Sequence, residues 1–166
     1  MKKCVFAGTF DPPTKGHLHI VEKCLEIFDE AVVAVMVNPE KTPLLTEEER
    51  ISLLKKLFEG ENRVKVRSFY GAAVDLLKEE NTPFYVRGVR NTVDFEYENQ
   101  NHFASKKLYG GIITIYIPAE QEEIHISSSL VRTSLKFDKE IFDYVPEKIK
   151  GGLLELLRKK RCLKSK

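Results

Sequence analysis

Residues 8–17 of the chain read Gly-Thr-Phe-Asp-Pro-Pro-Thr-Lys-Gly-His, and this stretch decides how the rest of the sequence is interpreted. It follows a short apolar run at residues 4–7, which is typical of a buried strand. Apolar residues spaced three and four apart follow it between Leu18 and Phe28, and this spacing predicts an amphipathic helix. The sequence therefore predicts a strand, a loop and a helix, and ligands of open α/β sheets bind at such loops.

The chemistry of this loop suits an anion. Gly8 and Gly16 allow the backbone to come close to a ligand. The predicted helix begins near Lys15 or Gly16, so its free N–H groups and the positive end of its dipole face the loop. Thr9 offers a hydroxyl group and Lys15 a positive charge. His17 lies in the first helical turn, where an imidazole N–H can donate to a phosphate oxygen.

The common nucleotide-binding motifs are missing from this loop. It has neither the G-x-x-x-x-G-K-[ST] pattern of a P-loop nor the G-x-G-x-x-G pattern of a dinucleotide site. A plain connection rich in glycine and proline, capped by a threonine, would explain the loop equally well on its own. The other loops of the chain therefore have to decide between the two interpretations.

Strand-like and helix-like segments alternate along the chain. Further strands are predicted at residues 31–37, 63–69, 83–86 and 112–117. Further helices are predicted at residues 51–58, 72–80, 93–108, 130–135 and from 146 onward, the first of them behind a Thr46–Glu49 capping box. This order predicts one α/β domain over residues 1–166, with a doubly wound, five-stranded parallel sheet and right-handed crossovers.

Composition narrows the class of protein. A charged fraction of 31% and the lack of an apolar run near the ~20 residues that span a bilayer predict a soluble chain with no membrane partner. The N-terminus is too short for a secretory signal before the first strand. Cys4, Cys24 and Cys162 are scattered and odd in number, so we expect reduced thiols in a cytoplasmic protein and no zinc site.

The charge distribution does not favour a nucleic-acid partner. Residues 158–166 hold six basic residues and no acidic one, and the remainder holds 21 basic and 25 acidic residues, a net charge of −4. A nucleic-acid-binding domain normally spreads its basic excess over a folded face. We therefore interpret residues 158–166 as a basic C-terminal tail whose charges suit the end of a solvated helix.

Groups that bind anions follow most of the predicted strands. These groups are residues 9–17, Lys41, residues 87–90 and residues 127–129, whereas Ala72 and Ala73 follow the third strand. Each group alone could be a solvated loop or a helix cap. Because the carboxyl ends of parallel strands meet at one edge of a sheet, we expect these groups to form one anion site.

The motifs together resemble the phosphopantetheine adenylyltransferase family of the nucleotidylyltransferase superfamily. They stand in the order Gly8-Thr9-Phe10-Asp11-Pro12, Thr14-x-Gly16-His17, Lys41, Arg87-Gly88-x-Arg90, Asp94-Phe95-Glu96-Tyr97-Glu98 and Ile126-Ser127-Ser128-Ser129-Leu130-Val131. The resemblance implies a Rossmann-like fold and a homohexamer. It also implies adenylyl transfer from ATP to 4′-phosphopantetheine, which gives dephospho-coenzyme A and pyrophosphate in coenzyme A synthesis.

The resemblance further implies a role for each matching residue. The implied catalytic residues are His17, Lys41 and Arg90. The implied ATP contacts are Thr9, Phe10, His17, Gly88, Val89, Arg90, Glu98, Glu123, Ile124, His125, Ile126, Ser127, Ser128 and Ser129. The implied contacts of 4′-phosphopantetheine are Thr9, Lys41, Ala73 and Arg87. Dephospho-coenzyme A or coenzyme A is the implied product or feedback ligand.

Three positions depart from the family pattern. Ala7 stands where a proline is common, Ala73 where a larger apolar residue is common, and His125 where an aromatic side chain is usual. The two later departures affect the packing expected around the pantetheine arm and the nucleotide. The basic tail lies outside the resemblance.

The residue types indicate a mechanism without a covalent enzyme intermediate. The sequence offers no Ser-His-Asp or Cys-His arrangement. The acceptor phosphate is already ionised, so we expect direct in-line attack on the α-phosphorus of ATP, with catalysis by positioning and charge neutralisation. Mg²⁺ is expected on the ATP phosphates, with no protein metal site.

Two alternatives stay open at this point. One is a sister nucleotidylyltransferase that uses CTP or another acceptor, such as glycerol phosphate or nicotinate mononucleotide. The other is an α/β module that binds a nucleotide without catalysis, which would leave His17, Lys41 and Arg90 without a reacting group to serve.

Overall fold

Strands and helices alternate in the computed structural model, which describes residues 1–37, 42–137, 139–141 and 143–164. The strands are β1 (Lys3–Gly8), β2 (Glu30–Met36), β3 (Val64–Phe69), β4 (Phe84–Val89) and β5 (Ile113–Pro118). The α-helices are α1 (Lys15–Ile27), α2 (Glu47–Leu57), α3 (Ala73–Glu79), α4 (Thr92–Leu108), α5 (Ser128–Lys136) and α6 (Glu147–Lys164). A short 3₁₀ helix covers Gln121–Glu123.

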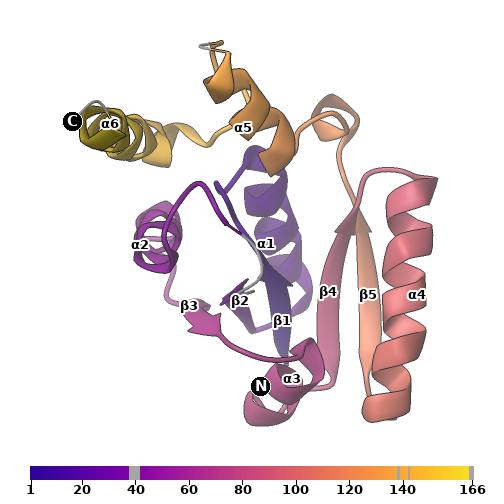
Figure 1. The fold of residues 1–166 in the computed structure, drawn as a ribbon. Helices are drawn as coiled ribbons and strands as arrows, with labels where there is room; N and C mark the ends of the chain where they lie inside the picture. The colour runs from indigo at the N-terminus through magenta and orange to yellow at the C-terminus, as the bar shows by residue number, and fades with distance from the viewer. Residues whose placement is uncertain (38–41, 138, 142, 165–166) are drawn as a thin grey trace.

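The strands form one sheet in the order β3-β2-β1-β4-β5, and every neighbouring pair is parallel (Figure 1). The predicted five-stranded parallel sheet is therefore confirmed. The chain builds one half outward from β1 to β3 and then crosses back to place β4 on the other side of β1. The strand order thus reverses between β1 and β4, and such a switch point leaves a crevice at the carboxyl ends of the strands.

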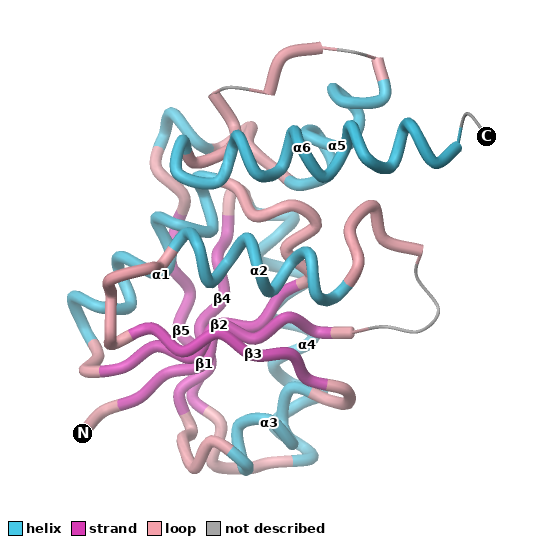
Figure 2. The backbone as a smooth tube through the Cα atoms, turned by 90° about the vertical axis from the view of Figure 1, so that its left-hand side faces the viewer, coloured by secondary structure: helices cyan, strands magenta, loops and turns pink. Residues whose placement is uncertain are grey.

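Helices cover both faces of the sheet. Figure 2 shows α1 and α2 on one side of the strands and α3 on the other. Alternation along β1 explains this, because Cys4 and Phe6 pack in the cluster with α1, whereas Val5 and Ala7 pack in the cluster with α3. Residues 31–35 of β2 are fully buried, as expected for a central strand covered on both faces.

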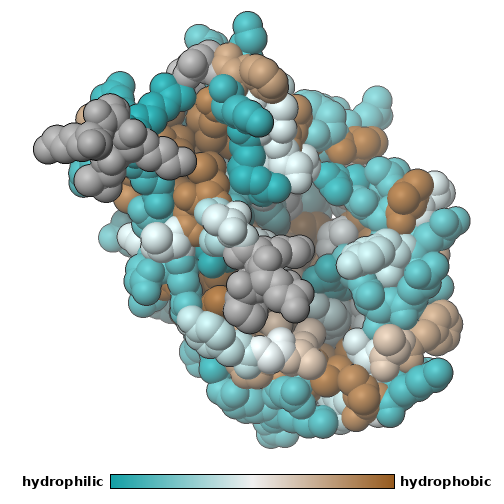
Figure 3. Space-filling model, viewed as in Figure 1, coloured by the Kyte–Doolittle hydropathy of each residue, from teal (hydrophilic) through white to brown (hydrophobic). Residues whose placement is uncertain are grey.

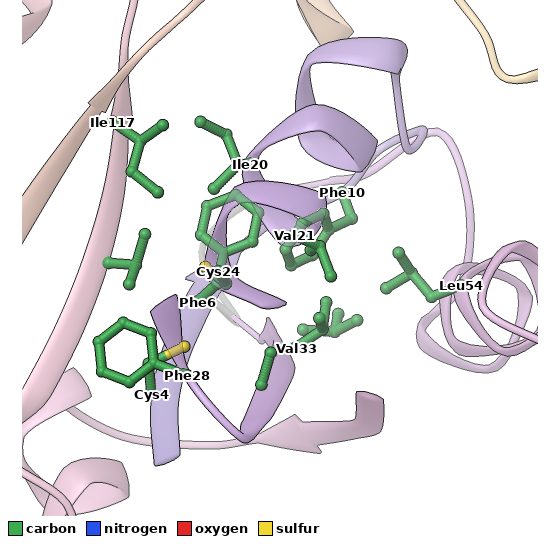
Figure 4. Packing of buried hydrophobic residues seen from close by; sticks show 13 residues of the cluster. Cys4, Phe6, Phe10, Ile20, Val21, Cys24, Phe28, Val33, Leu54 and Ile117 are labelled. Atoms are coloured by element: carbon green, nitrogen blue, oxygen red, sulfur yellow. The ribbon is translucent and has the colours of Figure 1, made fainter. Parts of the chain in front are cut away.

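The cluster between the sheet and α1 is continuous with the loop that follows β1. Figure 4 shows Phe6, Phe10 and Ile20 in one layer of packed side chains. The Cys4 and Cys24 thiols lie in the same cluster, where both are buried and free. This packing fixes the start of α1 against the end of β1.

A third cluster joins α2, α5 and α6. Leu53 of α2, Val131 of α5 and Leu153 of α6 are buried in it. Figure 3 shows hydrophobic atoms gathered where these three helices meet. The cluster holds the segment before α6 beside the start of α1, where the Lys15 N–H donates to the Tyr144 carbonyl over 2.9 Å. None of the described helices is both long and apolar enough to cross a membrane.

The prediction of a loop at residues 87–90 is wrong for its first three residues. Strand β4 continues through Val89, and Arg87 and Gly88 pair with residues of β5. Gly88 faces α1, where a Cβ would lie 3.0 Å from Cδ1 of Ile20. Glycine here makes room for a helix against the strand and is not part of a turn.

Candidate functional site

A cavity of about 500 Å³ opens at the carboxyl ends of β1 and β4. The predicted site residues that line it are Thr9, Phe10, His17, Arg87, Gly88, Val89, Arg90, Glu98, Glu123, Ile126, Ser127, Ser128 and Ser129. Ala73, Ile124 and His125 are not among its lining residues. Lys41 lies outside the described residues. The cavity occupies the crevice that the strand order creates.

Phe10 gives the loop after β1 its shape. Its backbone has a φ of 50°, in the left-handed region that bulky residues rarely adopt. Its buried ring meets Phe6 edge-on at 5.4 Å and His17 at 4.8 Å between ring centroids. A Cβ at Gly8 would lie 3.3 Å from this ring, so the glycine allows the ring to fold back over the strand.

His17 is held in a defined orientation at the start of α1. The backbone N–H of Thr14, the N-cap residue, donates to its Nδ1 over 3.0 Å. The neutral imidazole therefore carries its proton on Nε2. An N–H donor next to the positive end of a helix dipole suits a phosphate oxygen.

The surroundings keep His17 neutral. Burial lowers the pKa of His17 to about 4, with a further contribution from the positive charge of Arg90. The side chain therefore acts at neutral pH as a hydrogen-bond donor through Nε2 and carries no positive charge.

We expect kcat/KM to show no titration of His17 near pH 6.5. Protonation of His17 should leave kcat/KM unchanged from pH 8 down to about pH 5 and should lower it near pH 4. Because the unfolded chain binds this proton near pH 6.5 and the folded chain only near pH 4, stability should also fall as the pH drops through this interval. A pH–rate profile of the enzyme beside His17→Gln measures this, and a loss of kcat/KM centred near pH 6.5 in the unchanged enzyme alone would contradict it.

Arg87 lies on β4 and is bound on several sides by protein groups. Its Nε and Nη2 donate to the two carboxylate oxygens of Glu98, the former over 2.7 Å. Its Nη1 donates to the Ala7 carbonyl over 2.9 Å and to the Tyr85 hydroxyl over 3.0 Å. Glu98, a predicted ATP contact, is thus the ion-pair partner of Arg87 in this structure.

Two further arginines line the cavity. Arg90 donates to the carboxylate of Asp94 at the start of α4, from Nε over 2.7 Å. Arg132 donates to the Asp11 carbonyl over 2.7 Å and to the Ser129 hydroxyl over 3.0 Å. The sequence interpretation missed Arg132, which lies in the helix predicted at residues 130–135. Helix α5 begins at Ser128, so the spacing of three between Ser129 and Arg132 places the two side chains on one face.

Asp11 and Arg50 tie the loop after β1 to the start of α2, and the sequence interpretation gave neither a separate role. Both side chains are buried. The Asp11 carboxylate accepts from the N–H groups of Leu44 and Leu45, each over 2.8 Å. The Arg50 side chain donates to the Thr9 carbonyl over 2.9 Å. These bonds fix one wall of the cavity.

The start of α5 closes the cavity on another side. Ser127 caps the helix by accepting from the N–H of Leu130 over 3.0 Å. Ser128 donates to the Pro12 carbonyl over 2.8 Å. Ser129 accepts from Arg132, so the hydroxyl groups of all three serines are engaged within the protein. The N-termini of α1 and α5 both meet the cavity, and their free N–H groups remain suited to an anion.

These features together suit a polyphosphate. Two helix N-termini, the His17 Nε2–H and three arginines surround a single cavity. Arginine guanidinium groups and backbone N–H groups neutralise phosphate charge by directional hydrogen bonds.

Comparisons with known proteins agree with this geometry. A family model described as cytidylyltransferase-like matches residues 5–134. A phosphopantetheine adenylyltransferase of Heliobacterium modesticaldum is 36% identical over 155 residues, which cover 93% of this chain and 92% of the relative. Another of Clostridium novyi is 37% identical over 161 residues, which cover 97% and 100% of the two chains.

A solved structure supports the fold. The crystal structure of a candidate nicotinate-nucleotide adenylyltransferase from Vibrio parahaemolyticus matches this chain with a TM-score of 0.68. The match covers 93% of this chain and 99% of the other, at 22% sequence identity. At that identity the likeness concerns the arrangement of strands and helices.

Proposed function

Because the chain belongs to the phosphopantetheine adenylyltransferase family, we propose that it transfers the adenylyl group of ATP to 4′-phosphopantetheine. The products are dephospho-coenzyme A and pyrophosphate, and the reaction serves coenzyme A synthesis. The observation that carries the proposal is the convergence of the His17 Nε2–H and the N-termini of α1 and α5 on one cavity. Such a concentration of donors suits the charge of a triphosphate.

The reaction proceeds by direct displacement. An oxygen of the acceptor phosphate forms a bond to the α-phosphorus of ATP while the bond from that phosphorus to the bridging oxygen breaks, and pyrophosphate leaves. His17 donates a hydrogen bond to a phosphate oxygen on which charge increases, and Arg90 and Arg132 offset the charge of the triphosphate. The protein thereby contributes positioning and charge stabilisation and forms no covalent intermediate.

ATP brings Mg²⁺ with it as part of the substrate. Of the carboxylates that line the cavity, Asp11, Asp94 and Glu98 already accept hydrogen bonds from protein groups. Oε2 of Glu123 is buried and has no hydrogen-bond partner among the described residues. The described residues contain no group of three or more side chains suited to hold a metal ion. We propose that the ion is bound by the ATP phosphates.

We place the acceptor on the side of Arg87. Lys41, which lies outside the described residues, remains a predicted contact of the acceptor. Arg87 lines the cavity on the face of the sheet that α3 and α4 cover, and this placement supports contact with the acceptor phosphate. Ala73 begins α3 after the edge strand β3 and remains a predicted contact of the pantetheine arm. Dephospho-coenzyme A or coenzyme A would occupy the same cavity as product or feedback ligand.

Pyrophosphate release tests the proposed function. The enzyme is incubated with ATP or CTP, Mg²⁺ and a panel of acceptors that holds 4′-phosphopantetheine, glycerol phosphate and nicotinate mononucleotide. We expect release with ATP and 4′-phosphopantetheine together with dephospho-coenzyme A. Pyrophosphate release with another nucleotide and acceptor would mean that the proposed substrates are wrong. ATP binding without pyrophosphate release from any pair would favour a non-catalytic module.

We further propose that the chain forms a cytoplasmic homohexamer. Helix α4 has no buried residue, and its Val93, Phe103 and Leu108 are 71%, 58% and 68% exposed. Apolar side chains gathered on one helix favour contact with another subunit. The reduced thiols of Cys4 and Cys24 support a reducing compartment.

Light scattering during gel filtration is expected to give a mass about six times the 19.1 kDa of one chain. Replacing Phe103 by Glu should lower the mass, because a charge would then have to enter an apolar contact. The exposed Ile27→Glu on α1 is the matched control and should leave the mass unchanged. A mass near that of one chain for the unchanged protein would contradict the proposed assembly.

A further inference from the structure

Tyr85 contacts Arg87 in two ways on one face of strand β4. Its hydroxyl oxygen accepts from Nη1 of Arg87 over 3.0 Å. Its ring lies 5.4 Å from the Arg87 guanidinium carbon, within the range of a cation–π contact. The two residues are two apart along a strand, so their side chains share a face of the sheet.

The hydrogen bonds of Arg87 show what this contact does. A guanidinium group has five N–H donors in a rigid plane. Among the described residues, Glu98 takes one donor from Nε and one from Nη2. The Ala7 carbonyl and Tyr85 take both donors of Nη1. One N–H, on Nη2, is left for a ligand, and the plane of the group is fixed by partners on three sides.

We propose that Tyr85 is a positioning residue that orients Arg87 toward the phosphate of the acceptor. The inference rests on the proposed function, in which Arg87 binds that phosphate. Without the phenol oxygen, Nη1 loses one of its two partners, and the Ala7 carbonyl alone then holds this edge of the guanidinium group opposite the Glu98 ion pair. Burial raises the pKa of Tyr85, so the phenol stays protonated over the working pH range.

Tyr116 provides a matched control for this residue. It lies on β5 directly opposite Arg87 in the strand register, so its side chain shares the same face of the sheet. Its hydroxyl is also buried, yet it has no hydrogen-bond partner among the described residues. Replacing either tyrosine by phenylalanine removes one buried hydroxyl, and only one of the two hydroxyls contacts Arg87.

Steady-state kinetics of Tyr85→Phe and Tyr116→Phe test the inference. For Tyr85→Phe we expect the KM for 4′-phosphopantetheine to rise roughly 3- to 10-fold, which corresponds to one hydrogen bond. The kcat and the KM for ATP should stay within about twofold, because the lost contact serves acceptor binding. Tyr116→Phe should match the unchanged enzyme in all three constants. Thermal melting of both variants shows that the sheet is retained.

A second background isolates the contact with Arg87. Arg87→Lys removes the planar guanidinium group that Tyr85 contacts. Adding Tyr85→Phe to this variant should therefore change the acceptor KM by less than about twofold. If the enzyme is active and Tyr85→Phe and Tyr116→Phe have the same acceptor KM, the inference is wrong and the proposed function stands. The same holds if Tyr85→Phe raises the acceptor KM as much in the Arg87→Lys background as in the unchanged enzyme. Failure of the unchanged enzyme to release pyrophosphate with 4′-phosphopantetheine would overturn the proposed function and the inference with it.

Discussion

Replacing His17 by Ala is expected to lower kcat roughly 10²- to 10³-fold, about 3–4 kcal/mol of transition-state stabilisation. The Thr14 N–H fixes the imidazole so that Nε2 carries the proton, and burial keeps the ring neutral. A fixed neutral donor at the positive end of α1 stabilises charge on a phosphate oxygen without reorganising as the reaction proceeds.

The measurement is single-turnover and steady-state pyrophosphate release with both substrates saturating. His19→Ala is the matched control, since His19 lies two residues later on α1 and contacts Glu120 at 3.4 Å outside the cavity. Its kcat should change by less than about threefold. A His17→Ala enzyme within threefold of the unchanged one, with the same melting temperature, would remove His17 from the mechanism.

Replacing Asp11 by Ala is expected to destabilise the fold by about 3–5 kcal/mol. The carboxylate accepts from two backbone N–H groups, and the N–H of Leu45 is buried. Each N–H group left without an acceptor lowers the free energy of unfolding by about 1–3 kcal/mol, and the small cavity left by the side chain lowers it further. For a chain of this size the melting temperature should fall by roughly 10 °C.

The matched control for Asp11 is Asp29→Ala. Asp29 also accepts from a backbone N–H, that of Lys2 over 2.6 Å, but at an exposed site where water can replace it. Its loss should cost less than about 1 kcal/mol. Asp11→Asn keeps one acceptor oxygen and should lie between the two alanine variants. Calorimetry that finds Asp11→Ala within about 2 °C of Asp29→Ala would show that the two N–H groups find other partners.

Local patterns predicted most of the fold. The apolar run at residues 31–35 predicted β2, an interior strand of the sheet, because such a run is typical of a strand covered on both faces. The Thr46–Glu49 capping box is confirmed, with Thr46 N–H donating to the Glu49 carboxylate over 2.7 Å and Glu49 N–H to the Thr46 hydroxyl over 3.2 Å. In both cases the residues that interact are close in sequence.

The parts of the site that the sequence did not predict depend on distant contacts. Arg132 binds the Asp11 carbonyl across 121 positions, and Arg50 binds the Thr9 carbonyl across 41. Periodicity and spacing carry no information on such pairs. The end of β4 was predicted as a loop because glycine is common in turns. Gly88 is instead explained by the close approach of Ile20 from α1, a residue that is also distant in sequence.

The bonds from Ser128 to Pro12 and from Arg132 to Asp11 have a consequence for synthesis on the ribosome. The fifth strand ends at Pro118, so a nascent chain holds the whole sheet before α5 has been translated. Domains begin to fold from the N-terminus during translation, and contacts between distant residues close late. The wall of the cavity that α5 provides is therefore added last. A transcript truncated between residues 118 and 127 would yield all five strands and a ligand site that is open on one side.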